Sequence, residues 1–184
     1  MALLQPSNPD DGAAGFPGLS DPQLGSVAED RLATAIQLSA PGTVAVALPL
    51  LDLGFDLYPR RIRTLRAHPV QVKARSFLEA DGEFQASVGS LHPDPNGYVL
   101  LPYVPPPDWQ LHPRLWAIPI PQFLKVAQLH GDGYLFSGYL DASFARSATN
   151  QFLVDTNQLR RQWLDRIQGW KVGQEDIAVG VWVQ

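Results

Sequence analysis

The order of secondary-structure patterns along this chain constrains its fold more than any other feature: one amphipathic stretch precedes a long succession of short β-rich runs. In the first stretch, apolar residues recur at helical spacing, at Leu24, Val27, Leu32, Ala35, Ile36 and Leu38. Ser20 and Gln23 have the spacing of a capping box, Pro22 suits a first helical turn, and Pro41 followed by Gly42 is a stop signal. We therefore predict a helix that begins at Ser20 and ends at Pro41.

The remaining chain carries strand patterns separated by turn and proline signals. We expect strands over 43–50, 55–59, 69–77, 82–90, 98–104, 113–120 and 132–140, helices over 121–131 and 158–170, and a last apolar strand or docked segment over 176–184. The first strand is nearly all apolar, as a strand buried on both faces would be. This order predicts an α+β (mixed α/β) fold with a central mixed sheet flanked by helices.

Length and composition favour a single globular domain. The 184 residues fit a domain over 20–184 behind a flexible tail over 1–19, which is rich in Pro, Gly, Asp and Ala. The absence of cysteine excludes disulfides, thiolate zinc sites and a cysteine nucleophile, and it fits a cytoplasmic location. There is no run of 18 apolar residues and the N-terminus does not resemble a signal peptide, so we expect no membrane association.

The charge distribution gives two opposite indications about nucleic acid. A net charge of −4 argues mildly against a protein that binds phosphates. However, six of the fourteen basic residues lie within 16 residues of the chain, at Arg60, Arg61, Arg63, Arg66, Lys73 and Arg75. Such a hairpin could track phosphates, or its charges could simply keep a sheet edge soluble.

One set of residues fits the needs of a metal-dependent phosphodiesterase, which are oxygen ligands for a hard cation and a nearby ammonium group. Asp56 lies at the end of one expected strand. Gln71 and Lys73 are two apart on the next, so both side chains should point to one face. A hairpin centred near Arg63 would bring Asp56 opposite this pair, and Glu29 lies on the preceding helix.

In this order, the helix glutamate, "GFDL" and "VQVKARS" resemble the core of the PD-(D/E)XK phosphodiesterase superfamily. The QXK form is similar to Mrr-like restriction endonucleases and to related bacterial domain families of unknown function. The resemblance covers about residues 20–130 and implies a restriction-endonuclease-like core, with 131–184 as a C-terminal helical extension. It also implies a nuclease that acts on DNA with Mg²⁺ or Mn²⁺, with a homodimer as a compatible assembly.

The resemblance assigns a role to each residue of this set. Asp56 and Glu29 would bind the metal, helped by Gln71 and by the backbone carbonyl of Val72. Lys73 would be the catalytic lysine. The basic residues Arg60, Arg61, Arg63, Arg66 and Arg75 would contact DNA.

The sequence departs from the superfamily pattern at Gln71, where a neutral amide replaces an acidic ligand. An amide offers an oxygen to a cation but no charge, so another acid would have to compensate. Asp52, Glu79 and Glu83 are the candidates.

Two other interpretations stay open. The chain could be a nuclease-like module that binds nucleic acid or protein without catalysis, which the acidic balance and Gln71 favour. It could also be an unrelated α+β domain, in which Asp56 is a turn acid, Lys73 an edge lysine and Glu29 part of a solvated helix face. No histidine pair, nucleophile elbow or phosphate-binding glycine loop indicates another chemistry.

Overall fold

The computed structural model describes residues 18–49, 54–62, 67–89, 91–141 and 148–167. The first helix, α1 (Asp21–Ser39), has the predicted bounds within two residues. Its capping box is formed, because the Ser20 N–H donates to the side-chain oxygen of Gln23 across 3.0 Å. Its buried residues, Leu24, Ala28, Leu32 and Ile36, recur every four residues and form one stripe.

The strands form three sheets. A two-stranded antiparallel ribbon contains β1 (Val44–Ala47) and β2 (Tyr58–Arg61). The central sheet has the order β3 (Val70–Val72), β5 (Tyr98–Pro102), β6 (Arg114–Pro119), β9 (Leu153–Asp155), and the third sheet has the order β4 (Glu83–Val88), β8 (Gly133–Tyr139), β7 (Gln128–His130). In the central sheet β3 is parallel to β5, whereas the other pairs are antiparallel. The predicted α+β class with a mixed central sheet is therefore confirmed.

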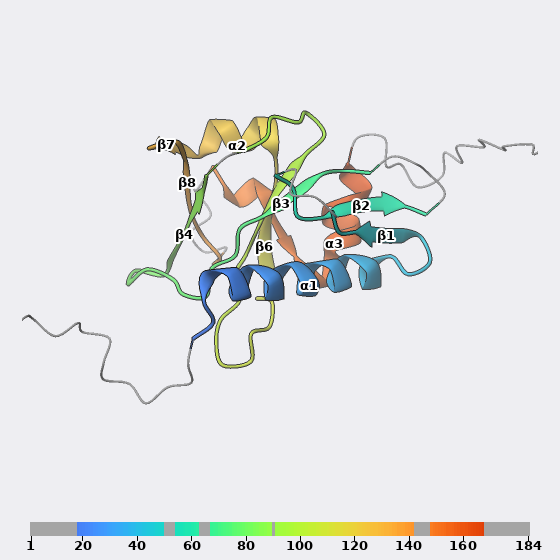
Figure 1. Ribbon diagram of the computed structural model, residues 1–184, viewed down its shortest axis with the longest axis horizontal. Helices are drawn as coiled ribbons and strands as arrows, with labels where there is room; N and C mark the ends of the chain where they lie inside the picture. The colour runs from blue at the N-terminus through green and yellow to red at the C-terminus, as the bar shows by residue number, and fades with distance from the viewer. Residues whose placement is uncertain (1–17, 50–53, 63–66, 90, 142–147, 168–184) are drawn as a thin grey trace, which may run out of the picture.

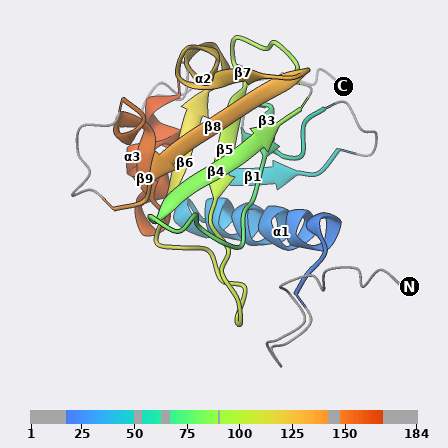
Figure 2. The same cartoon turned by 90° about the vertical axis from the view of Figure 1, so that its left-hand side faces the viewer.

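The central sheet is covered on both faces (Figures 1 and 2). On one face, α1 and the short helix α3 (Leu159–Gln162) pack in one apolar cluster with Leu100 and Leu115. On the other face, the third sheet and α2 (Ile120–Val126) pack in a second cluster with Val99 and Trp116. Successive residues of β5 and β6 thus alternate between two cores, which is why these strands are apolar almost throughout.

Several predicted elements differ from the structure. The helix expected over 121–131 ends at Val126, and strand β7 (Gln128–His130) follows it. The strand expected over 43–50, predicted to be buried on both faces, is the short β1, in which Val44 is buried and Ala47 exposed. It pairs with β2 alone, outside the central sheet, and Val44 and Val46 pack on one face into the cluster that contains α1. The sequence of this strand is apolar enough for a strand of the core. Its burial is nevertheless set by the sheet to which it belongs, a ribbon of two strands.

The predicted helix over 158–170 is wrong within the described residues. Only α3 is α-helical, the backbone leaves the helical region at Trp163 (φ −125°), and a 3-10 turn, Leu164–Arg166, follows. Trp163, Leu164 and Ile167 are all buried in the cluster under α1, and such burial outweighs helix propensities of a few tenths of a kcal/mol per residue. The region 131–184, expected to be a helical extension, also contributes β8 and β9 to the two larger sheets. The expected segment 176–184 and the tail over 1–17 lie outside the described residues.

Within the described ranges, no helix combines the length and the apolar character that crossing a bilayer requires.

Candidate functional site

Asp56 lies at the open end of the hairpin formed by β2 and β3, next to the last main-chain pairing between the two strands. Antiparallel bridges join Leu57 to Val70 and Arg60 to Ala67, a register whose midpoint falls between positions 63 and 64, as predicted. The Asp56 N–H still donates to the Val70 carbonyl (2.8 Å). One step further along β3, the acceptor for the Val72 N–H is the Asp56 side chain, at 2.6 Å from Oδ2. The carboxylate is thereby fixed at the edge of β3.

The backbone of Val72 supplies a second oxygen at the same edge. In an extended strand, the N–H and C=O of one residue point to the same side, so the Val72 carbonyl faces the edge at which Asp56 lies. On the other edge, the Lys73 N–H donates to the Leu100 carbonyl across 3.0 Å, which fixes the start of the segment after β3 to the central sheet. The backbone of Lys73 is therefore fixed by the sheet, directly after the residue whose N–H binds the Asp56 carboxylate.

The helix contributes acidic residues from its first turns. Asp21, Gly25 and Glu29 recur every four residues, so they share one side of α1. This side adjoins the buried stripe that holds the helix against the central sheet. Glu29 therefore faces the end of β3 across the helix–sheet boundary.

These three segments and one edge of β4 enclose a pocket of about 420 Å³. Its lining is Asp21, Pro22, Leu24, Gly25, Glu29, Asp56, Val72, Lys73, Ala74, Arg75, Ser76, Phe77, Ala86 and Ser87. Four residues predicted to bind the metal or to act in catalysis, Glu29, Asp56, Val72 and Lys73, thus lie in one pocket although up to 44 positions separate them in sequence. We call it the Asp56 pocket.

The pocket perturbs the carboxyl group of Glu29. Burial raises the pKa of Glu29 above its ordinary value of 4.5, and the charges of Asp56 and then Asp30 raise that pKa further. The charge of Lys73 acts in the opposite direction and lowers it. The charges of Asp56 and Lys73 therefore both act on the pKa of the Glu29 carboxyl group.

Gln71 is not part of this pocket. Its side chain is 5% exposed, and it lies in register with Val99, which belongs to the apolar cluster between the two larger sheets. In-register residues on neighbouring strands point to the same face, so Gln71 faces that core. Gln71 therefore does not line the pocket with Lys73, and a role for it in metal binding stays a prediction.

Of the acids proposed to compensate for Gln71, none lines the Asp56 pocket in the described residues. Glu79 and Glu83 are absent from its lining, and Asp52 lies outside the described residues. The additional acid is Asp21, at the first position of α1. Its signal in the sequence is the spacing of four and eight residues to Gly25 and Glu29, which places Asp21 on the same side of the helix as Glu29.

The donor set of the pocket suits a hard cation. Mg²⁺ is commonly held by one or two carboxylates, with water and substrate phosphate completing the shell. Asp56 and Glu29 supply carboxylates and Val72 supplies a carbonyl. Within the part of the chain that the structure describes, no three His, Cys, Asp or Glu side chains gather closely enough to form a metal cluster by themselves. Water or a substrate phosphate would therefore have to complete the shell of a cation held here.

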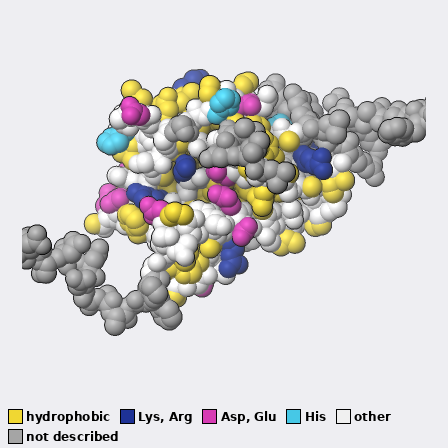
Figure 3. All heavy atoms as spheres, viewed as in Figure 1, with side chains coloured by type: hydrophobic (Ala, Val, Ile, Leu, Met, Phe, Trp, Pro, Cys, Tyr) yellow, Lys and Arg dark blue, Asp and Glu magenta, His cyan; other side chains and the backbone are white. Residues whose placement is uncertain are grey.

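The predicted DNA-binding arginines divide into two places. Arg75 lines the Asp56 pocket, whereas Arg60 and Arg61 lie on β2, in the ribbon beside α1. Arg63 and Arg66 lie outside the described residues. On the face seen in Figure 3, acidic and basic side chains are interspersed, as the net charge of −4 leads one to expect.

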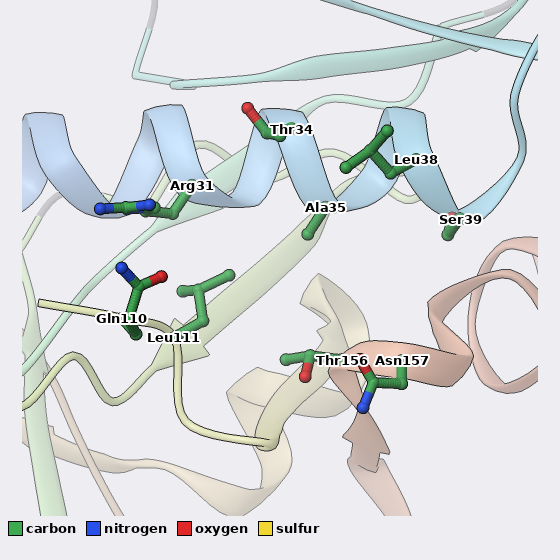
Figure 4. Close-up of a pocket in the computed structure, with 9 residues that line it drawn as sticks. All are labelled: Arg31, Thr34, Ala35, Leu38, Ser39, Gln110, Leu111, Thr156 and Asn157. Atoms are coloured by element: carbon green, nitrogen blue, oxygen red, sulfur yellow. The ribbon is translucent and has the colours of Figure 1, made fainter.

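A second hollow of about 420 Å³ lies along the C-terminal half of α1 and differs in chemistry (Figure 4). Its lining combines Arg31 with hydroxyl, amide and apolar side chains: Thr34, Ala35, Leu38, Ser39, Gln110, Leu111, Thr156 and Asn157. It contains no carboxylate, so it offers no charged oxygen ligand to a divalent cation. This hollow is therefore a poor candidate for a divalent-cation site.

Comparison with known proteins leaves the chain without an assigned family. No protein-family model matches it, and no curated protein matches it. Among solved structures, it is similar to a bacterial homing endonuclease, I-Ssp6803I, with 16% sequence identity and a TM-score of 0.46 over 66% of this chain and 77% of that one. At this level of similarity the comparison assigns no activity to the chain.

Proposed function

We propose that this protein is a metal-dependent phosphodiesterase that acts on DNA. The observation that carries the proposal is the Asp56 pocket, in which Glu29, Asp56, the Val72 carbonyl and Lys73 come together from a helix and two strand ends. Carboxylate oxygens, a carbonyl oxygen and one ammonium group are the components that phosphodiester hydrolysis with Mg²⁺ or Mn²⁺ requires.

Each residue has a role in this proposal. Asp56 and Glu29, with the Val72 carbonyl, would hold the cation, which when bound polarises a phosphate and makes water more acidic. Lys73 would orient the attacking water and offset the negative charge that develops on the phosphate. The raised pKa of Glu29 supports this arrangement, because a cation would relieve the repulsion between Glu29 and Asp56.

The basic residues would contact the DNA backbone. Arg60 is exposed on β2, where it can reach a phosphate without losing a buried contact. Arg75, inside the pocket, would lie closer to the reacting phosphate than the arginines of β2. We keep Arg61, Arg63 and Arg66 as predicted contacts of the same hairpin.

A second candidate function is a nuclease-like module that binds nucleic acid or protein without cleaving. The position of Gln71 favours this second function. Because Gln71 does not line the Asp56 pocket, β3 supplies no side-chain oxygen ligand from position 71. Membership of the PD-(D/E)XK superfamily, the cytoplasmic location and the homodimer stay predictions from the sequence.

A cleavage assay separates the two candidates. The purified full chain is incubated with supercoiled plasmid, linear duplex and single-stranded DNA, in Mg²⁺, in Mn²⁺ and in excess EDTA. We expect cleavage that requires the cation and that falls at least about 100-fold in Lys73→Ala, a typical loss for an acid–base or charge-stabilising group. Lys125→Ala, which removes an exposed lysine on α2, is the matched control.

The outcomes are distinct. Cleavage that is lost in Lys73→Ala but kept in Lys125→Ala supports the phosphodiesterase. Equal cleavage by the wild-type protein and Lys73→Ala contradicts it. DNA binding without cleavage under any cation supports the binding module.

A further inference from the structure

An exposed aromatic ring lies at the edge of the Asp56 pocket. Six large apolar side chains are exposed among the described residues: Leu38, Leu48, Ile62, Phe77, Leu124 and Leu129. Phe77 is the aromatic member of this set, is 51% exposed, and is the member that lines the Asp56 pocket. A phenylalanine ring open to water beside charged residues has a π-face available to a ligand.

Arg75 orders this ring. Its guanidinium carbon lies 4.8 Å from the centroid of the Phe77 ring, which is a cation–π contact. The Arg75 Nε–H donates to the Gln85 carbonyl across 2.6 Å, so β4 fixes the guanidinium plane. This hydrogen bond uses one of the five N–H donors of the guanidinium, which leaves terminal donors for an anion.

The backbone at Arg75 is hydrogen-bonded to the central sheet and the chain that follows it. The Arg75 N–H donates to the Pro102 carbonyl (3.1 Å), and the Val104 N–H donates to the Arg75 carbonyl (2.8 Å), so the segment after β3 continues to pair with the chain after β5. Lys73, Arg75 and Phe77 follow one another at spacings of two residues in this segment. The lysine, the guanidinium and the ring therefore occur as one ordered row along the pocket.

We propose that Phe77, ordered by Arg75, is a stacking platform for a base next to the phosphate held in the Asp56 pocket, and that the substrate is single-stranded or locally unpaired DNA. This inference rests on the proposed function and specifies its substrate class. Aromatic rings that carry unpaired bases beside a cationic groove are a general device for binding single strands.

We expect duplex DNA to use the Phe77 ring less well than a single strand does. In a duplex each base is already stacked on both neighbours, so a base reaches the Phe77 ring only after it leaves the stack. A single strand has no such cost. The ring therefore selects for unpaired nucleotides, whereas Lys73 and Arg75 contact phosphates of either form.

A binding assay that does not depend on cleavage tests the platform. Fluorescence anisotropy with Ca²⁺ in place of Mg²⁺ gives the affinity for a single-stranded oligonucleotide and for the duplex of the same sequence. Quenching of 2-aminopurine in the single strand reports stacking. The variants are Phe77→Leu, which keeps an apolar side chain, Phe77→Trp, which keeps a ring, and Leu129→Ala, which removes another exposed apolar side chain as the control.

We expect the wild-type protein and Phe77→Trp to prefer the single strand and to quench 2-aminopurine. Phe77→Leu should bind the single strand roughly 10-fold more weakly, with the quenching lost and duplex affinity unchanged. Leu129→Ala should behave as wild type. The platform is overturned if Phe77→Leu binds and quenches as wild type, if the wild type prefers duplex, or if it binds no DNA.

The cleavage assay with Lys73→Ala keeps the two proposals separable. Cleavage of duplex and single strand at equal rates, insensitive to Phe77→Leu, would retain the phosphodiesterase and overturn the platform. Binding of single strands that depends on Phe77, without cleavage by the wild type, would retain the platform and contradict the phosphodiesterase.

Discussion

The Val72 N–H donates a hydrogen bond of 2.6 Å to Oδ2 of Asp56. In a longer hairpin a main-chain carbonyl of the partner strand would accept this bond, and here the Asp56 side chain accepts it instead. Two consequences follow from it. The carboxylate is held at the edge of β3 by one of its two oxygens, and it lies where the Val72 carbonyl also faces. Stability and metal binding at this position therefore depend on different properties of one side chain, namely its hydrogen-bond acceptor and its charge.

Asp56→Asn separates these two properties. The amide oxygen of asparagine can still accept from the Val72 N–H, so we expect little change in the folded structure. The lost charge should weaken Mn²⁺ binding by more than the roughly 10- to 100-fold that loss of a second-shell partner costs. Isothermal titration with Mn²⁺ measures this, and circular dichroism checks the fold. Asp132→Asn, in the exposed turn before β8, is the control, and an unchanged Mn²⁺ affinity in Asp56→Asn would exclude Asp56 as a ligand.

Glu29→Gln should make the stability of the protein less sensitive to pH. Burial, and then the charge of Asp56, raise the folded-state pKa of Glu29 above 4.5. Between the unfolded-state pKa of 4.5 and the higher folded-state pKa, the folded protein therefore binds more protons than the unfolded chain. The free energy of unfolding falls as pH rises through this window. The loss of stability caused by the ionised Glu29 is fully present above the folded-state pKa, and it is absent below the unfolded-state pKa.

In thermal melts we thus expect Glu29→Gln to have a higher Tm than wild type at pH 8 and a similar Tm at pH 4. The gain should be a few degrees at most, since about 1 kcal/mol corresponds to roughly 2–4 °C for a chain of this size. Mg²⁺ should raise the wild-type Tm at pH 8 more than that of the variant. A variant less stable than wild type at pH 8 would show that the Glu29 carboxylate is not under electrostatic penalty.

Local signals in the sequence were sufficient for α1 and for the hairpin. The capping box of Ser20 and Gln23 forms as its spacing indicates, because a cap depends on residues within one turn. The hairpin register that places Asp56 opposite β3 follows from pairing around positions 63 and 64. The hairpin register suffices to bring Asp56 next to β3, whereas Glu29 joins them because α1 packs against the central sheet.

The remaining features depend on packing between distant segments. Alternation along the strand predicted that Gln71 and Lys73 share a site. The pairing with the chain of β5 does continue to Lys73 and Arg75, but Gln71 is 5% exposed beside the apolar cluster between the sheets and does not line the pocket. Asp21 and Phe77 enter the pocket because the first turn of α1 lies against the chain after β3, a contact between segments about 50 residues apart. No pattern within a single element encodes such a contact.

Gln71→Glu tests where this side chain points. If Gln71 faces the apolar cluster between the sheets, the new carboxyl group is buried without a charge partner, and we expect a loss of about 2 kcal/mol or more in the free energy of unfolding. Mg²⁺ affinity should stay unchanged. Urea denaturation and metal titration measure the two quantities, with Gln128→Glu, on the exposed strand β7, as the control. Tighter Mg²⁺ binding at preserved stability would instead place position 71 in the metal site.

Arg60→Ala should weaken DNA binding without affecting the pocket. Arg60 is exposed on β2, so its removal creates no cavity. If it contacts one phosphate, the slope of log affinity against log salt should fall in magnitude by about 0.7–0.9, equally for all sequences. Anisotropy titrations at several salt concentrations measure the slope, and Arg160→Ala, on α3, is the control. An unchanged slope would remove Arg60 from the DNA interface.

Gly25 offers a way to close the Asp56 pocket without touching a charged residue. It lines the pocket between Asp21 and Glu29 on α1, and a Cβ placed there meets nothing within 4 Å. Gly25→Ala should therefore stabilise the protein by up to about 1 kcal/mol, because alanine replaces glycine inside a helix. Gly25→Trp has the same backbone benefit, but its ring would fill much of a pocket of about 420 Å³.

We expect Gly25→Trp to remain folded, with a Tm at least equal to that of wild type, while its cation-dependent DNA cleavage is lost. Ser26→Trp is the matched control, because Ser26 is exposed on the next position of α1 and does not line the pocket. It carries the same ring on the same helix and should cleave as wild type. If both tryptophan variants cleave equally well, the reaction takes place elsewhere, since a blocked pocket cannot admit a phosphate to Asp56 and Lys73.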